Sequence, residues 1–147
     1  MKIVNLREHI EFLHDYVALR NQYAEQLCSC LMSIEETYQW LHHQKVEVFL
    51  MIEDKTLLGV GILYLHKMGE VTLFVQEKNR GIASMLLHYI IQHGEAVNIS
   101  KMWAWISTEN KISQRVFTKY GFVLIKQKTK KYSNHLCEGL IYELSSN

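Results

Sequence analysis

The sequence predicts an α/β fold of the α+β type, in a single domain spanning residues 1–147. Two strand-to-helix units and a run of neighbouring strands support this prediction. Residues 71–75 are bulky and apolar or β-branched, and Ile82, Leu86 and Ile90 then recur at helical spacing. A second unit of this kind covers 102–122. The chain has no Pro, no Ser/Gly-rich linker and no internal repeat to mark a domain boundary.

The first half of the chain reads as strand, helix, helix and three strands. A short strand at 3–6 precedes a helix over 8–20, and Ser33 and Glu36 form the capping-box pattern that begins a second helix. Residues 46–53 and 56–66 are expected to be strands joined by a tight turn, and residues 67–69 lead into the strand at 70. Three antiparallel strands therefore follow one another. Two glycines inside the second indicate a bulge or a close backbone approach.

The second half supplies the remaining strands. Residues 102–106 are apolar on both faces, as expected of a central strand covered by helices. Residues 122–127 and 139–144 are predicted strands on either side of a polar loop that contains 132–135. A charge run holds Lys126, Lys128, Lys130 and Lys131. We expect it to be a solvated strand edge that discourages further pairing, with a phosphate-binding patch as the alternative.

Composition limits the partners of this chain. Apolar residues make up 48% of 147 residues, and the formal net charge of +1 gives no overall attraction for nucleic acid or an anionic membrane. No apolar run approaches the roughly 18 residues of a membrane span, and residues 1–11 lack the features of a signal peptide. We therefore expect a cytoplasmic monomer or homodimer without nucleic-acid or membrane partners.

The cysteines and histidines point to no metal. Cys28, Cys30 and Cys137 are odd in number, and the first two are too close for the usual zinc spacing. Reduced thiols are therefore expected. His66 and His135 fall near predicted loops that could frame a substrate cleft, where a neutral imidazole can take a proton near physiological pH.

The junction between residues 75 and 82 is a candidate phosphate site. Gly81 opens a helix just after a buried strand, so the free N–H groups of the first turn and the helix dipole behind them favour a phosphate. The alternative is an ordinary strand-to-helix turn whose glycine only eases the bend.

Taken together, the two strand-to-helix units resemble the GNAT superfamily of acetyl-CoA-dependent N-acetyltransferases. The family's phosphate loop reads Gln or Arg, two residues, Gly, one residue, then Gly or Ala, and Lys78, Gly81 and Ala83 stand in these places. Its second motif has Asn, Ala, Tyr and then Gly-Phe. The matching positions here are Asn110, Ser113, Phe117, Gly121 and Phe122.

The resemblance implies a GNAT fold, with a mixed, mostly antiparallel central sheet of about seven strands flanked by about four helices. It also implies acetyl-CoA as cosubstrate and no metal. Strand N–H groups around Phe74 and Val75 would polarise the thioester carbonyl, Asn110 would hold the pantetheine arm and Ser84 would reinforce the phosphate site. The implied acetyl-CoA-binding residues are Leu73, Phe74, Val75, Lys78, Asn79, Arg80, Gly81, Ile82, Ala83, Ser84, Asn110 and Phe117.

Three residues are candidates for proton transfer. Glu70 lies at the start of the predicted strand, where several enzymes of the family place a catalytic Glu, so it is the candidate base. The alternative is that Glu70 is an exposed carboxylate of a hairpin. Phe117 replaces the family's Tyr and cannot donate a proton to the departing sulfur. Ser113 and Tyr120 are the candidates to replace it, unless Ser113 merely substitutes for Ala and Tyr120 belongs to the core.

The acceptor side is also inferred from a resemblance. Residues 19–21, 33–36 and 40–41 are similar to the branch that includes nucleotide-amino-sugar acetyltransferases and acetylators of ribosomal-protein N-termini. Arg20 and Asn21, with the two loop histidines, are then candidate substrate-binding residues. We expect acetyl transfer to a primary amine of a small molecule, preferably a nucleotide-linked amino sugar, by direct attack in a ternary complex. A protein N-terminal acetyltransferase and a non-catalytic acetyl-CoA or CoA-binding module are the alternatives.

Overall fold

The computed structural model describes residues 1–76 and 80–145 and is built around a seven-stranded sheet. The strand order is β1-β2-β3-β4-β5-β9-β6. Within this sheet β4 and β5 run parallel, and the other neighbouring strands run antiparallel. Four α-helices accompany the sheet. The predicted fold class is therefore confirmed.

The bounds of the elements are as follows. The strands are β1 (Lys2–Asn5), β2 (Val46–Glu53), β3 (Thr56–Tyr64), β4 (Glu70–Val75), β5 (Lys101–Ser107), β6 (Val123–Gln127), β7 (Lys130–Tyr132), β8 (His135–Cys137) and β9 (Gly139–Ser145). The helices are α1 (Leu13–Gln22), α2 (Ile34–His43), α3 (Ile82–Ala96) and α4 (Lys111–Lys119), with 3-10 turns η1 (Leu6–Glu8), η2 (Ile10–Phe12) and η3 (Leu65–Lys67).

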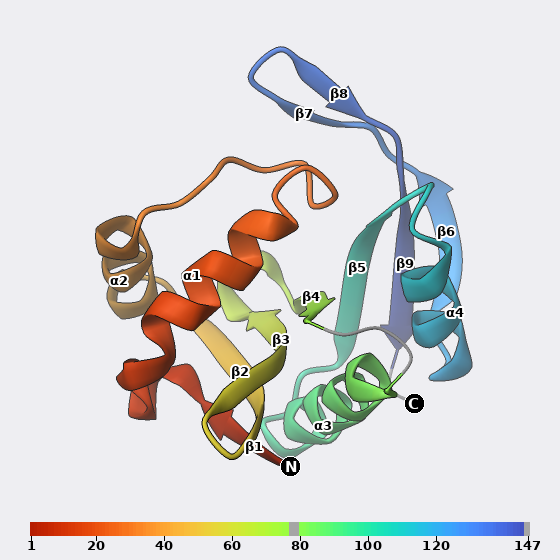
Figure 1. Ribbon diagram of the computed structural model, residues 1–147. Coiled ribbons are helices and arrows are strands. Elements are labelled where there is room, and N and C mark those ends of the chain that lie inside the picture. The colour runs from red at the N-terminus through yellow and green to blue at the C-terminus, as the bar shows by residue number, and fades with distance from the viewer. Residues whose placement is uncertain (77–79, 146–147) are drawn as a thin grey trace.

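Three predicted boundaries or elements were wrong. The helix expected over 8–20 begins only at Leu13, because His9, with φ −134° and ψ 59°, separates two 3-10 turns before it. The strand expected to reach residue 66 ends at Tyr64, where η3 begins. The polar loop around 132–135 is a small hairpin, β7–β8, that turns at Ser133 in the left-handed region and projects from the main sheet (Figure 1).

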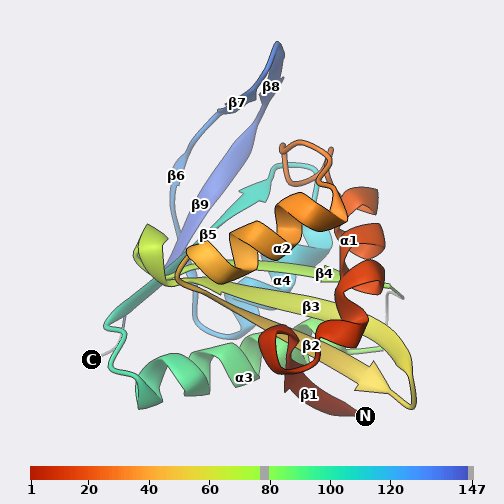
Figure 2. The ribbon, with the colours of Figure 1, turned by 90° about the vertical axis from the view of Figure 1, so that its left-hand side faces the viewer.

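Two apolar layers enclose the sheet. Helices α1 and α2 cover one face, while α3 and α4 cover the other (Figures 1 and 2). A Cβ atom on Gly59 would lie 2.8 Å from Ile82 Cγ2, and one on Gly61 would lie 2.6 Å from Ile90 Cδ1. The two glycines therefore mark a close approach of α3 to β3, while the register shift of the β2–β3 pair lies between Met51 and Ile52 of β2.

The predicted capping box at the start of α2 is confirmed. The Ser33 hydroxyl accepts a hydrogen bond from the Glu36 N–H at 3.0 Å, and the Glu36 carboxylate accepts one from the Ser33 N–H at 3.1 Å. This local pattern fixes where α2 begins, independently of tertiary contacts.

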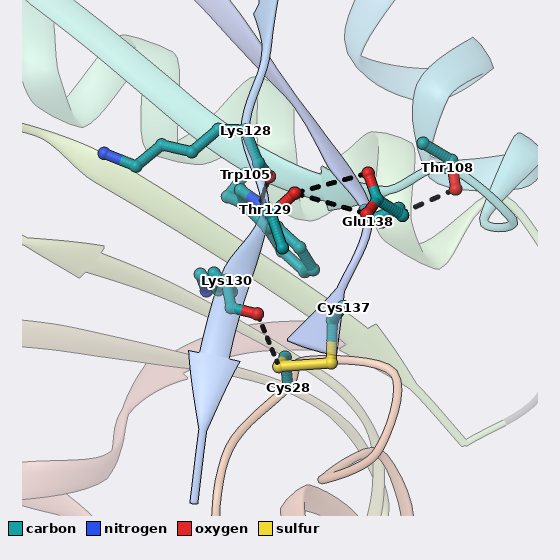
Figure 3. The surroundings of a disulfide bond; sticks show 8 residues. All are labelled: Cys28, Trp105, Thr108, Lys128, Thr129, Lys130, Cys137 and Glu138. Atoms are coloured by element: carbon teal, nitrogen blue, oxygen red, sulfur yellow. Dashed lines mark hydrogen bonds between the residues drawn. A yellow bond between two sulfur atoms is a disulfide. The ribbon is translucent and has the colours of Figure 1, made fainter. Parts of the chain in front are cut away.

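The cysteine prediction was wrong. Cys28 and Cys137 form a disulfide across 109 residues of sequence, and only Cys30 is a free thiol (Figure 3). Sequence spacing could not reveal this pair, because the fold brings the segment after α1 against β8. Because these two cysteines are paired, the cysteines do not indicate that the protein lies in a reducing compartment. In the described part of the chain, no helix has the length and apolar composition needed to cross a bilayer.

Candidate functional site

The candidate site lies where the two parallel strands of the sheet separate. Strands β4 and β5 share one register pair, Glu70 with Trp103, and the Trp103 N–H donates to the Gly69 carbonyl at 3.1 Å. Beyond this point β4 remains paired with β3, and β5 with β9. Ligands of open sheets bind outside the carboxyl ends of parallel strands, where the chain changes direction in the sheet.

The separation leaves one backbone edge of β4 facing away from β3. The Gln76 N–H donates to the Leu58 carbonyl on the β3 side at 2.7 Å, whereas the Val75 carbonyl accepts the Tyr23 hydroxyl at 2.6 Å on the opposite side. Because backbone direction alternates along a strand, the N–H groups of Leu73 and Val75 face the separation. The Phe74 N–H points toward β3 instead, and its ring is buried in the core beneath α1, so among the strand N–H groups around Phe74 and Val75 the ones that can meet a ligand are those of Leu73 and Val75.

The first turn of α3 meets the far end of this edge. Gly81 caps the helix with φ 71°, and a Cβ atom there would have no heavy atom of the described residues within 4 Å. The first intrahelical hydrogen bond runs from the Met85 N–H to the Gly81 carbonyl at 3.1 Å, so the N–H groups of residues 82–84 have no intrahelical acceptor. These three amides and the open space beside Gly81 suit an anionic group.

The remaining predicted phosphate-loop residues contribute in different ways. Lys78 and Asn79 lie outside the described residues. Arg80 pairs with Glu53 of β2, with 3.4 Å between Nη2 and Oε1. The side chain of Ile82 is buried against the sheet, so only its backbone amide can contact a ligand, whereas Ala83 and Ser84 remain partly exposed.

A narrow cleft of about 20 Å³ lies between β4, β5 and α4. Its lining comes from four parts of the chain, which are the segment after α1, β4, β5 and α4, and it includes the predicted residues at the start of α4. The lining residues are Gln26, Leu27, Val71, Thr72, Leu73, Trp105, Ile106, Ser107, Asn110, Ser113 and Phe117. The volume is close to that of a single water molecule, so a larger group would need the cleft to widen.

Asn110 and Ser113 hold each other at the cleft. The Asn110 side-chain oxygen caps α4 by accepting the Ser113 N–H at 3.1 Å, and its Nδ2 group donates to Ser113 Oγ at 3.0 Å. Since Ser113 Oγ is the acceptor in the second bond, its own proton remains available for another acceptor.

Phe117 and Tyr120 occupy different surroundings. The Phe117 ring lines the cleft and packs edge-on against Phe122, with 4.9 Å between the ring centroids. Tyr120 follows the last residue of α4 and packs beside His88 of α3, at 5.9 Å between the ring centroids. Of the two predicted replacements for the family's Tyr, only Ser113 lies at the cleft.

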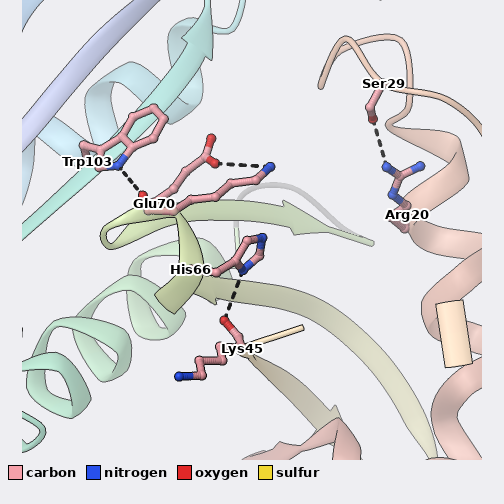
Figure 4. A network of polar contacts seen from close by, with 7 residues as sticks. Arg20, Ser29, Lys45, His66, Glu70 and Trp103 are labelled. Atoms are coloured by element: carbon pink, nitrogen blue, oxygen red, sulfur yellow. Dashed lines mark hydrogen bonds and ion pairs between the residues drawn. The ribbon is translucent and has the colours of Figure 1, made fainter. Parts of the chain in front are cut away.

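Glu70 is buried at the other end of β4, with 7% of its surface exposed. It is therefore not the exposed hairpin carboxylate of the alternative interpretation. Lys67 Nζ lies 3.9 Å from its Oε1 atom (Figure 4). Burial raises the pKa of Tyr64, the register partner of Glu70 on β3, to about 12, and the Glu70 carboxylate adds to this shift while a hydrogen bond with Thr72 opposes it.

Arg20 and Asn21 hold the segment that connects α1 to α2. The Arg20 guanidinium donates to the Cys30 carbonyl and, at 3.0 Å, to Ser29 Oγ (Figure 4). The Asn21 side chain bonds both the N–H and the carbonyl of Met32 at 2.9 Å. The structure thus gives both residues a part in shaping the segment beside the cleft, and their direct contact with substrate stays a prediction.

Tyr23 is a residue of this segment that sequence reasoning missed. Its hydroxyl bonds the Val75 carbonyl, and its ring lies 5.9 Å from the Phe74 ring. Burial raises the pKa of the Tyr23 phenol, while the bond to Val75 opposes that shift. No sequence signal identifies this contact, because its partner is a backbone atom 52 residues away.

The two predicted histidines do not share a pocket among the residues described. His66 is exposed on η3, with Nδ1 3.3 Å from the Lys45 carbonyl (Figure 4). His135 is exposed on β8 and lines a separate pocket of about 900 Å³, between the segment after α1 and the β7–β8 hairpin. Their roles in substrate binding stay predictions.

Known structures share this fold along nearly the whole chain. The ribosomal-protein-alanine N-acetyltransferase from Brucella melitensis superimposes with a TM-score of 0.86 at 17% identity, covering 99% of this chain and 100% of that one. The structure of yncA from Salmonella typhimurium with its cofactor acetyl-CoA gives 0.84 at 14% identity, with coverage of 98% and 92%. The spermidine N-acetyltransferase from Vibrio cholerae in complex with CoA and spermine gives 0.81 at 15%, with coverage of 98% and 94%.

Sequence comparison identifies the family. No curated protein sequence matches the chain. The family model described as the GNAT acetyltransferase family matches residues 12–122, which include both strand-to-helix units, the separation of β4 and β5, and the cleft. The chain therefore belongs to the GNAT family of N-acetyltransferases.

Proposed function

We propose that this N-acetyltransferase binds acetyl-CoA along the free edge of β4 and transfers the acetyl group directly to a primary amine in a ternary complex. The observation that carries the proposal is the separation of β4 and β5. Three features follow one another along β4 at this separation: the buried carboxylate of Glu70, the cleft beside α4, and the first-turn amides of α3. A bound acetyl-CoA would supply the acetyl group as a thioester.

The chain offers groups that fit each part of this cosubstrate. The N–H groups of Ile82, Ala83 and Ser84 would bind the pyrophosphate at the positive end of the α3 dipole. The N–H groups of Leu73 and Val75 would bind amide or carbonyl oxygens along the β4 edge. Asn110 and Phe117 line the cleft where the pantetheine arm would end.

Three residues would then act at the reacting atoms. Glu70 would accept a proton from the acceptor ammonium, directly or through water, because only the free amine is a nucleophile. A β4 N–H group facing the separation would stabilise the developing negative charge on the acetyl oxygen. The Ser113 hydroxyl, whose proton is not used by Asn110, would donate to the sulfur as it leaves.

The acceptor we favour is an amino sugar attached to a nucleotide. Its support is the resemblance of residues 19–21, 33–36 and 40–41 to acetyltransferases of such sugars. The segment after α1, fixed by Arg20, Asn21 and Tyr23, would then form one wall of the acceptor site.

Product analysis tests this proposal. The purified protein is incubated with acetyl-CoA and a panel of amines that includes amino sugars, nucleotide-linked amino sugars, N-terminal peptides and polyamines, and the acetylated products are identified by mass spectrometry. We expect an acetylated small-molecule amine whose formation requires Glu70. Binding of acetyl-CoA without any acetylated amine would instead favour a non-catalytic CoA-binding module.

A further inference from the structure

A row of side chains crosses three strands at the acceptor end of β4. Tyr64 of β3 and Trp103 of β5 are the register partners of Glu70 on either side. The Trp103 indole N–H donates to the Lys67 carbonyl at 2.9 Å, which fixes η3 beside the row (Figure 4). The Lys67 ammonium then lies 4.9 Å from the Tyr64 ring centroid and 3.9 Å from the Glu70 carboxylate.

A second ammonium group, on the β7–β8 hairpin, lies over β5 next to this row. Lys130 Nζ lies 4.3 Å from the ring centroid of Trp105, which is two residues along β5 from Trp103 and on the same face (Figure 3). Burial lowers the pKa of Lys130, the Glu70 carboxylate raises it, and the Lys67 ammonium lowers it further. The prediction of a solvated edge is therefore wrong for Lys130, whose neighbours at 128 and 131 are exposed.

The charges around Glu70 do not balance. The Lys67 ammonium pairs with Glu70, the Lys130 ammonium interacts electrostatically with both of them, and the Arg20 guanidinium is close enough to lower the pKa of the neighbouring Tyr64. Lys130 is partly buried, and a partly buried charge is costly unless it is paired, so its positive charge, together with that of the exposed Lys67, favours an anionic ligand. When Glu70 takes a proton during the reaction, it loses its charge and the excess of positive charge increases. A polyamine acceptor would add further positive charge.

We propose that the acceptor amine carries a carboxylate or phosphate group that binds Lys67 and Lys130 while its nitrogen faces Glu70. This inference rests on the proposed function, since it describes the acceptor of the same reaction. Lys67 Nζ and the Glu70 carboxylate are 3.9 Å apart. If the anionic group accepts a hydrogen bond of about 3 Å from Lys67, and the reacting nitrogen donates one of about 3 Å to Glu70, the anionic group lies no more than about 10 Å from that nitrogen. Lys67 and Lys130 are thus specificity residues on either side of the acceptor.

Direct binding tests this inference without requiring turnover. The protein is saturated with CoA and titrated with O-phosphoethanolamine, β-alanine, ethanolamine and spermidine, at constant ionic strength. The indole N–H signals of Trp103 and Trp105 are followed by NMR. Trp40 of α2, which packs between Tyr16 and Tyr64, reports any change that spreads to the other side of the row. We expect at least one anionic amine to shift the first two signals and to bind about tenfold more tightly than ethanolamine or spermidine. Comparison of O-phosphoethanolamine with β-alanine identifies which anion the site prefers.

Matched variants assign the effect to the two lysines. Lys67→Gln and Lys130→Gln should each weaken binding of the preferred anionic amine about tenfold more than they weaken binding of ethanolamine. Lys131→Gln removes an exposed charge from the same hairpin and should have no effect. Lys130→Arg keeps the positive charge and should restore most of the affinity.

The outcome separates this inference from the proposed function. Equal binding of charged and uncharged amines, or equal affinity in Lys67→Gln, Lys130→Gln and Lys131→Gln proteins, would overturn the anionic acceptor. Acetylation of spermidine in preference to anionic amines would also overturn it, while leaving the proposed acetyl transfer intact. If anionic amines bind selectively through both lysines but no amine is acetylated, the proposed acetyl transfer is refuted. The anion-binding site would then still stand.

Discussion

Glu70 is the side chain on which proton transfer at this site depends. It is buried where β4 meets β3 and β5, and its Oε1 atom lies 3.9 Å from Lys67 Nζ. The Tyr64 phenol beside it, with a pKa of about 12, stays protonated at neutral pH and cannot replace the carboxylate as a base. The residue therefore combines burial, a fixed position and a negative charge at the entrance of the separated strands.

We expect Glu70→Gln to keep acetyl-CoA binding and to lower turnover by about 10²-fold, because the amide cannot accept the ammonium proton. The deficit should shrink at high pH, where free amine exists without help from a base. Turnover from pH 6 to 10 and acetyl-CoA affinity by calorimetry measure the two effects. Glu143→Gln removes another sheet carboxylate, paired with Lys101 at 3.3 Å, and is the control. Wild-type turnover of Glu70→Gln at all pH values would exclude Glu70 from the mechanism.

Phe117 raises the question of how the sulfur leaves without the family's Tyr. A CoA thiol resembles cysteine, with a pKa of about 8.5, so its thiolate leaves without full protonation. We therefore expect Phe117→Tyr to raise turnover by less than about tenfold, and Ser113→Ala to lower it by less than about tenfold. Single-turnover rates measured with saturating acetyl-CoA report both changes.

The control for Phe117→Tyr is Phe122→Tyr, which adds the same hydroxyl to the partner ring of this edge-on pair. A gain of about 10²-fold specific to Phe117→Tyr would show that the natural chain lacks an acid that it needs. The CoA-binding module would then be the better description of the chain.

At the scale of the element, the start of α3 sets the position of the proposed phosphate site. Gly81 adopts φ 71°, a conformation in which a β-branched residue is strongly disfavoured, and the space beside it is open. The helix therefore needs glycine here for its backbone conformation, and a ligand approaching the amides benefits from the missing side chain.

Gly81→Val should reduce CoA affinity by at least about 10²-fold, because the branched side chain both strains the cap and fills the approach to the amides. Asparagine tolerates the left-handed conformation, so Gly81→Asn adds a side chain beside the amides with little strain. This variant therefore separates the effect of backbone strain from the effect of blocking the approach to the amides. Isothermal calorimetry measures affinity, and circular dichroism checks that each variant is folded. An unchanged CoA affinity in a folded Gly81→Val protein would contradict the phosphate site.

At the scale of the whole molecule, the Cys28–Cys137 bond joins the segment after α1 to the β7–β8 hairpin (Figure 3). These two parts lie on either side of the pocket that contains His135. The bond closes a loop of 109 residues, which restricts the unfolded chain over most of its length.

Cys28→Ser and Cys137→Ser should each lower the free energy of unfolding, by up to about 4 to 5 kcal/mol on the loop-entropy account. Urea denaturation without reductant measures this loss, and Cys30→Ser, at the free thiol, should leave the free energy nearly unchanged. Equal stability of all three variants, or three free thiols in the native protein by mass spectrometry, would contradict the crosslink.

The sequence by itself determined the local elements and the family. The capping box of α2, the apolar face of α3 and the glycine at its start depend on residues within a few positions of one another, so their patterns are readable without tertiary contacts. The two spaced motifs were likewise sufficient to indicate the acetyltransferase fold.

Only the tertiary structure decided which groups meet at the site. The direction of the Phe74 amide depends on strand register, which a shift of one residue reverses. The Tyr23–Val75 contact and the disulfide join residues 52 and 109 positions apart, and Lys130 of the hairpin lies over the ring of Trp105 in β5. Such contacts arise from how whole elements pack, and the local spacing of residues carries no record of them.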